Sequence, residues 1–330
     1  MTTKGETLYP LKFQPMLKPV IWGGSAISRF KNIQPVQEGI GESWEVSGMK
    51  GEASVVSNGY LKGKSLEELI IEHQGSLLGE SIHKRFEETF PLLIKLIDAQ
   101  EALSIQVHPD DKLAKERHDS FGKTEMWYVI RATPGAYLYS GFKHSITPEE
   151  YVEKVNDNTL TDALQRYEVK EGDVFFLPAG RVHAIGAGCF MAEIQQTSNI
   201  TYRIFDYNRK DAAGKTRELH TDLAKDAIDF RVYNSYQTHY IRGMNQSVEL
   251  VTSPFFTTSL LELDESITCD YRNIDSFIVY ICVKGSATLK DDRGYTVEAT
   301  RGESILIPAN RQWMEIMPDG HCTLLETRPQ

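Results

Sequence analysis

Two segments far apart in the sequence carry the same pattern. Residues 172–183 read GDVFFLPAGRVH, and residues 302–313 read GESILIPANRQW. Glycine, an acid, proline, alanine and arginine recur in register, and short apolar runs separate the turn-forming residues, as in strand–turn–strand units. A second pair of similar segments, 128–138 and 278–289, recurs in the same order. The sequence therefore predicts two related β-barrels in one chain.

The remaining pattern favours a mainly β protein in which a few helices are added to the N-terminal part. We expect two jelly-roll barrels, one over residues 1–238 with helical insertions and one over 239–330. Helix-capping signals predict the insertions: Ser65 with Glu68 three residues later begins one helix, and Thr147-Pro148 begins another. A further helix is expected over 111–119.

Composition excludes several classes of partner. The formal net charge of -10 argues against a nucleic-acid partner, because phosphate backbones are bound by basic surfaces. No apolar run approaches the roughly 20 residues of a membrane span, and residues 1–6 lack the apolar core of a signal peptide. The four cysteines show no CxxC spacing, so free thiols and a cytoplasmic location are expected. An anionic substrate would require a local cluster of cations.

Polar residues alternate with apolar ones in the segment 104–111. Ser104, Gln106 and His108 fall on one face of the expected strand, with Ile105 and Val107 on the other. Side chains two positions apart lie roughly 6.5–7 Å from each other at the backbone, so Gln106 and His108 can reach one metal ion. Asp110 and Asp111 are better explained as helix caps than as metal ligands.

Two later segments direct further ligands to the same space. Lys123 and Glu125 share a face of the next strand, and His183 ends the first copy of the repeat. Together with Gln106 and His108 they suggest a mixed nitrogen and oxygen site for a catalytic divalent ion. The second copy has Trp313 where the first has His183, and tryptophan cannot ligate a metal. We therefore expect the C-terminal barrel to lack a metal site.

These segments resemble the type I mannose-6-phosphate isomerases (phosphomannose isomerases) of the cupin superfamily, in particular the short bacterial form. The similar motifs are Trp22-Gly23-Gly24, residues 41–45, 90–95, 103–110, 122–127 and 178–184. The resemblance spans nearly the whole chain. It implies one Zn2+ per chain, held by Gln106, His108, Glu125 and His183.

The resemblance also implies which other residues line the pocket. Arg203 matches the active-site arginine of the family, and Ser104, Lys123 and Glu193 match pocket residues. Asn199 stands where the family has an acid. The family's downstream lysine has no firm counterpart, although Arg209 or Lys210 could replace it.

The implied reaction interconverts mannose 6-phosphate and fructose 6-phosphate through an enediolate, which needs a Lewis acid and a general base. Glu193 is the first candidate for the base, and a metal-bound hydroxide is the alternative. Arg203 and Lys123 would bind the substrate or stabilise the enediolate. The expected partner is a small sugar phosphate, and the chain would be a monomer or homodimer.

Two alternative functions are compatible with such a barrel. One is an iron-dependent cupin oxygenase, although these sites usually carry a His-x-His pair and here Gln106 takes the first position. The other is a non-catalytic sugar-phosphate-binding cupin. Metal content would separate the oxygenase from the isomerase, and turnover would separate both from a binding protein.

Overall fold

The computed structural model describes residues 7–210 and 214–330. The expectation about a signal peptide concerns residues 1–6, which lie outside the described residues. The chain folds into two compact units. Unit 1 comprises residues 1–16, 45–93 and 239–330, and unit 2 comprises residues 17–44 and 94–238.

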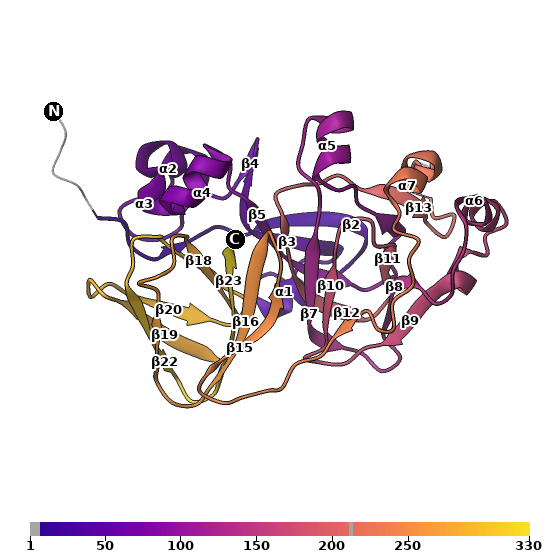
Figure 1. Cartoon of the computed structure of the whole chain (residues 1–330). Helices are drawn as coiled ribbons and strands as arrows, with labels where there is room; N and C mark the ends of the chain where they lie inside the picture. Colours follow the sequence, from indigo (N-terminus) through magenta and orange to yellow (C-terminus); the bar gives the residue numbers. More distant parts are fainter. Residues whose placement is uncertain (1–6, 211–213) are drawn as a thin grey trace. The chain divides into compact units, whose positions relative to one another are not determined.

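Two antiparallel sheets form the body of unit 2 (Figure 1). The larger has the order β14(Gln237–Thr238)-β10(Val174–Leu177)-β7(Glu125–Ala132)-β12(Cys189–Gln196)-β5(Leu92–Ala99)-β3(Ile40–Met49)-β2(Met16–Gly24). Strand β4(Glu52–Ala53) belongs to unit 1 and pairs with the end of β3 at Gly48 and Met49. The smaller has the order β13(Tyr202–Phe205)-β6(Ile105–Val107)-β11(His183–Ile185)-β8(Tyr137–Phe142)-β9(Leu164–Glu168). The chain passes between the two units within β2, β3 and β5.

An apolar core lies between these two sheets. Trp127 and Met191 from the larger sheet pack in one buried cluster with Leu138 and Ile185 from the smaller. Apolar side chains that alternate along strands thus fill the barrel at one end, and polar side chains occupy the same interior further along β7 and β12.

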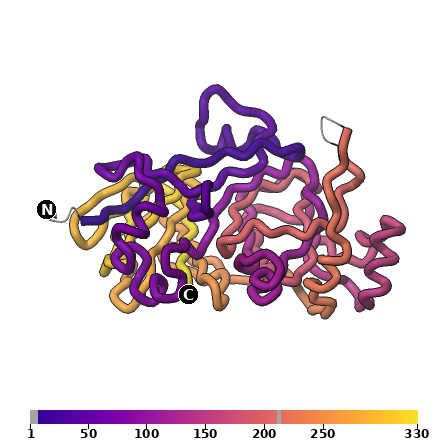
Figure 2. Tube along the Cα trace, turned by 90° about the horizontal axis from the view of Figure 1, so that it is seen from above, coloured from indigo at the N-terminus to yellow at the C-terminus, as the bar shows by residue number. Residues whose placement is uncertain are grey.

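Helices cover the outer face of the smaller sheet. The helices of unit 2 are α1(Ala26–Phe30), α5(Asp111–His118), α6(Pro148–Asn156) and α7(Thr221–Ala227), with the 3-10 turn η1(Leu160–Ala163). Tyr151 of α6 and Ala224 of α7 pack in one cluster with Ile105 and Val107 of β6. Helices α6 and α7 lie side by side in both views (Figures 1 and 2). Because Ile105 and Val107 face outward into this core, Gln106 between them faces into the barrel.

Unit 1 repeats the strand pairing of unit 2. One sheet has the order β1(Leu11–Lys12)-β21(Ser304–Ile307)-β18(Ile278–Lys284)-β23(Cys322–Pro329)-β16(Phe256–Leu263)-β15(Ser247–Thr252). The other has the order β17(Ile267–Asp270)-β22(Trp313–Pro318)-β19(Ser286–Asp291)-β20(Thr296–Thr300). The run β21-β18-β23 corresponds to β10-β7-β12, which confirms the two related barrels expected from the repeat.

Local capping signals set the helix starts. Helices α2(Leu66–His73), α3(Gly75–Leu78) and α4(Glu80–Phe86) belong to unit 1. Ser65 and Glu68 form the expected capping box of α2, and Thr147 forms the same motif at α6. The Asp110 side chain accepts a hydrogen bond from the Leu113 backbone N–H at 2.8 Å, so this residue caps α5 as expected.

The predicted boundary at residue 238 coincides with one passage between units, while residues 45–93 belong to the same unit as the C-terminal barrel. The assignment of residues 1–238 to one catalytic domain stays a prediction. Among the described residues, no helix is long and apolar enough to cross a membrane.

Candidate metal centre

Two imidazoles and a carboxylate meet inside the barrel of unit 2. His108 follows β6, Glu125 begins β7 and His183 begins β11, and one donor atom of each lies within 4.8 Å of the others. His183 Nε2 lies 3.3 Å from one Glu125 oxygen, and His108 Nε2 lies 3.6 Å from the other. All three side chains are buried. Within the residues that the structure describes, this is the one such group of histidine, cysteine and acidic side chains.

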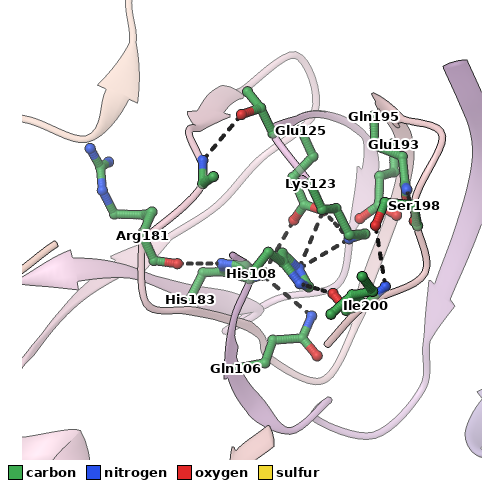
Figure 3. Close-up of polar contacts among 12 residues, drawn as sticks. Gln106, His108, Lys123, Glu125, Arg181, His183, Glu193, Gln195, Ser198 and Ile200 are labelled. Atoms are coloured by element: carbon green, nitrogen blue, oxygen red, sulfur yellow. Dashed lines mark hydrogen bonds and ion pairs between the residues drawn. The ribbon is translucent and has the colours of Figure 1, made fainter. Parts of the chain in front are cut away.

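Backbone carbonyls fix the orientation of both imidazoles (Figure 3). His108 Nδ1 donates to the Ile200 carbonyl at 2.8 Å, and His183 Nδ1 donates to the Arg181 carbonyl at 2.8 Å. A neutral imidazole with its proton on Nδ1 presents a lone pair on Nε2, and both Nε2 atoms face Glu125. Burial, together with the nearby Lys123 ammonium, lowers the pKa of His183 to about 3 and that of His108 well below its usual value. Both rings are therefore neutral near pH 7, the protonation state that binds a metal.

Lys123 places a positive charge against this group. Its Nζ donates to His108 Nε2 at 3.0 Å and forms an ion pair with Glu125 Oε2. Burial, reinforced by the nearby Glu193 carboxylate, raises the pKa of Glu125 to about 7 despite that lysine. The other oxygen of Glu125, Oε1, accepts no hydrogen bond from the described residues. A buried carboxylate that retains an unsatisfied oxygen and faces two imidazole lone pairs fits a divalent cation.

Gln106 joins the group through the sheet register. It pairs with His183 on one side and Arg203 on the other, so the three side chains share one face of the smaller sheet. Gln106 Nε2 donates to His183 Nε2 at 3.3 Å. A half-turn of the amide would present Oε1 instead, which is the atom that a metal would need.

Lys95 holds the other polar side chains of the barrel together. Its Nζ lies 3.3 Å from Glu193 Oε1 and 3.6 Å from Glu42 Oε2, although only 4% of its side chain is exposed. This lysine lies in an otherwise mainly apolar strand, and the structure supplies two carboxylate partners for it. Trp127 Nε1 donates to the other Glu193 oxygen at 2.8 Å. Burial opposes ionisation of Glu193, but Lys123 and Lys95 outweigh it and lower the pKa of this carboxyl to about 2.

Arg203 and Ser104 are less directly connected to the three ligands. The Arg203 guanidinium donates to the Glu218 carbonyl at 3.0 Å, while its Nε has no partner in the described part of the chain. It therefore shares a face with Gln106 without contacting the His–Glu–His group. Ser104 is buried just before β6, and no contact links it to that group.

Two further side chains that received no functional role from the sequence lie in this interior. Trp127 is fully buried and lies edge-on to the His183 ring at 5.3 Å. Gln195 pairs with Glu125 across β12 and β7, and its amide donates to the carbonyls of Gln196 and Ser198. Strand alternation in the sequence already puts Trp127 on the face of Glu125 and Gln195 on the face of Glu193.

A jelly-roll barrel that directs two neutral imidazoles and a carboxylate inward defines a metal-binding cupin. The profile described as "Phosphomannose isomerase type I, catalytic domain" matches residues 10–168, and "Mannose-6-phosphate isomerase, cupin domain" matches residues 246–329. The chain belongs to the type I mannose-6-phosphate isomerase family.

Individual relatives agree with this assignment. The chain is 37% identical over 303 residues to "Mannose-6-phosphate isomerase ManA" of Bacillus subtilis, covering 91% of this chain and 88% of that protein. It is also 37% identical over 260 residues to "Mannose-6-phosphate isomerase" of Streptococcus mutans, covering 78% and 80%. The crystal structure of the mannose 6-phosphate isomerase from Bacillus subtilis matches with a TM-score of 0.86 and 32% identity, covering 96% of this chain and 99% of that one.

Proposed function

We propose that this protein is a metal-dependent isomerase that interconverts mannose 6-phosphate and fructose 6-phosphate. The observation that carries the proposal is the buried His108–Glu125–His183 group, with a lysine against it, in a chain of this family. Neutral imidazoles and an incompletely satisfied carboxylate are donors for a divalent cation.

Zinc is the ion that we propose for this group. Two imidazole nitrogens and one carboxylate oxygen form the kind of three-residue set that leaves a coordination position for substrate. Gln106 would be the fourth ligand through its amide oxygen. When bound, the ion polarises the carbonyl and hydroxyl oxygens of the sugar and so makes the neighbouring C–H more acidic.

Glu193 is the proposed base. In the direction from the aldose, its carboxylate takes the proton from C2 of the open-chain sugar, the C–H electron pair forms the C1=C2 bond, and the C1=O electron pair moves onto O1 to give the enediolate. Glu193 then returns its proton to C1 while the O2 proton moves to O1, which leaves the C2 ketone and restores the carboxylate. Because Lys123, Lys95 and the Trp127 N–H keep Glu193 ionised at neutral pH, it can accept a proton, but it is a weak base. The reaction therefore depends on strong polarisation of the sugar carbonyl.

The two remaining cations are proposed to bind the anionic parts of the substrate. Arg203 lies on the same sheet face as Gln106, and its guanidinium has an unused Nε among the described residues. Lys123 lies against the ligands themselves and is placed to stabilise charge that develops on the sugar oxygens. In a chain with net charge -10, these cations would provide the local attraction that a sugar phosphate requires. A cytoplasmic location and a monomeric or homodimeric state stay predictions.

A coupled assay on the purified chain tests the proposal. Mannose 6-phosphate is supplied and fructose 6-phosphate is measured before chelation, after chelation and after addition of zinc. We expect turnover to disappear with the chelator and to return with zinc. A folded, zinc-loaded sample without turnover would contradict the isomerase, and recovery with iron alone would contradict the assignment of zinc.

A further inference from the structure

Unit 2 has a pocket that is separate from the candidate metal centre and lies at the opposite end of β7 and β12. Its volume is about 520 Å³, within the size range of sites for small organic ligands. Helix α1, the end of β5, the β7–β8 turn and residues 187–190 line it. Arg131 in its wall is six positions after Glu125 along β7, which separates the two sites by about 20 Å at the rise of an antiparallel strand.

Two arginines give this pocket its charge. Arg29 of α1 and Arg131 of β7 both line it, and both are exposed. Neither arginine forms an ion pair within 4 Å in the part of the chain that the structure describes. The Arg29 guanidinium donates one hydrogen bond to a described residue, Ser25, whose Oγ lies at 3.3 Å. Guanidinium groups present planar arrays of donors that match carboxylate and phosphate oxygens. Two of them at one pocket, in a chain of net charge -10, favour an anion.

Aromatic rings form a second feature of the wall. Phe190 of β12 is paired with Arg131 across the sheet, and the guanidinium carbon lies 5.6 Å from the centre of its ring. Phe30 contacts Phe190 edge-on at 4.9 Å, and Tyr137 lines the pocket on β8. The pocket therefore combines cations with aromatic side chains, of which Tyr137 is half-buried and Phe190 is 2% exposed, and this combination favours a ligand that has both an anionic group and a flat ring.

The acidic side chain in the wall is already bound within the protein. Asp98 at the end of β5 is 6% exposed, and its Oδ2 accepts a hydrogen bond from the Ala26 backbone N–H at 2.6 Å. Burial raises the pKa of this carboxyl, while the Ala26 N–H and the nearby Arg131 act in the opposite direction. The same carboxylate packs so closely on Gly24 that a Cβ there would lie 2.7 Å from Oδ2. Asp98 thus fixes α1, and with it Arg29, at the edge of the pocket.

We propose that this pocket is a second binding site, for a small organic anion in which a carboxylate or phosphate group is attached to a planar ring. The anionic group would bind between Arg29 and Arg131, and the ring would pack against Phe190 and Tyr137. The site is separate from the metal centre, so the inference does not depend on the isomerase activity.

Calorimetric titration of the full-length, zinc-loaded protein tests the inference. The probes are phenyl phosphate, benzoate and inorganic phosphate, and the variants are Arg29→Gln and Arg131→Gln. Loss of one charge-assisted contact is expected to weaken phenyl phosphate binding about tenfold to a hundredfold. The control variant Arg231→Gln removes an exposed arginine of the same unit that pairs with Asp229, and it should bind as the unaltered protein does. Benzoate should compete with phenyl phosphate.

Two further measurements separate this pocket from the metal centre. Arg203→Gln, which removes the cation beside Gln106, should leave the affinity for phenyl phosphate unchanged, and Arg131→Gln should leave isomerase turnover unchanged without ligand. Equal affinity for inorganic phosphate and phenyl phosphate would overturn the proposal, because the ring would then contribute nothing. So would binding that is lost in Arg203→Gln and retained in Arg131→Gln.

Discussion

Lys95 provides the sharpest test of how the barrel interior is held together. Its ammonium group is buried, with carboxylate oxygens of Glu193 and Glu42 at 3.3 and 3.6 Å. Lys95→Met preserves much of the volume and removes the charge, so Glu193 is left ionised in the interior. Removing one partner of a buried pair costs about 3–5 kcal/mol of unfolding free energy. For a unit of this size, we expect a fall in Tm of about 6–20 °C.

The stability that Lys95→Met loses depends on pH with a defined sign. In the unaltered protein the pKa of Glu193 lies near 2, so its contribution to stability is present above the usual carboxyl pKa and lost as pH falls toward 2. Lys95→Met raises that pKa, and protonation then relieves the unpaired charge. The difference in stability between the two proteins is therefore expected to be largest near neutral pH and to shrink as pH falls. The acidic limb of kcat/KM should move to higher pH in the variant, because a protonated Glu193 cannot accept a proton.

Denaturant unfolding at about pH 7 and about pH 4.5, with kcat/KM profiles, measures both effects. Lys170→Met is the control, since this lysine is exposed in the same unit. The double variant Lys95→Met with Glu193→Gln should recover more than half of the lost stability, because Trp127 can donate to the neutral amide. A loss below about 1 kcal/mol for Lys95→Met, or no recovery in the double variant, would refute the reasoning.

The remaining predictions concern separate parts of the molecule. His183→Ala should lower the zinc retained after gel filtration by at least about tenfold, because the loss of even a residue that only hydrogen-bonds a metal ligand lowers metal affinity by that factor. Stoichiometric zinc in the variant by elemental analysis would contradict the role of His183 as a ligand. Arg203→Gln should lower kcat/KM about tenfold to a hundredfold without changing Tm, while Arg231→Gln keeps full activity; equal kinetics for both would exclude Arg203 from substrate binding. Ser65→Ala should cost about 1 kcal/mol in denaturant unfolding by removing the α2 cap, and an unchanged midpoint would show that the cap is dispensable. Gly188→Ala should cost about 1–3 kcal/mol, because φ is 85° there and the new Cβ would lie 2.0 Å from a threonine hydroxyl; a variant as stable as the unaltered protein would contradict this.

Short-range patterns were sufficient to predict much of the fold. The capping box at Ser65 and the cap at Asp110 depend on residues three positions apart, so their interactions can be read from sequence. Strand alternation placed His108 and Ile105 on opposite faces, and the structure packs Ile105 into the outer core with residues of α6 and α7. The repeat predicted two barrels because the same turns recur in the same order.

The partners of the buried charges depended on tertiary structure. The structure pairs Glu193 with Lys95 and Trp127, each from a different strand, and no pattern near Glu193 in the sequence indicates either partner. The order β7-β12-β5 in the sheet determines that choice, and local pattern does not contain it.

The sequence by itself determined which candidate metal ligands face inward: two histidines, a glutamine and a glutamate. Side chains alternate between the two faces of a strand, so the position of each residue in its strand fixes the face on which it lies. What only the tertiary structure decided is their electrostatic state. Burial lowers the pKa of His183 to about 3 and raises that of Glu125 to about 7. The enclosing sheets cause both shifts by excluding water, and the charges that add to them, Lys123 at His183 and Glu193 at Glu125, come from segments distant in sequence. The residue types could thus be read from the sequence, whereas their protonation states depend on burial inside the folded barrel.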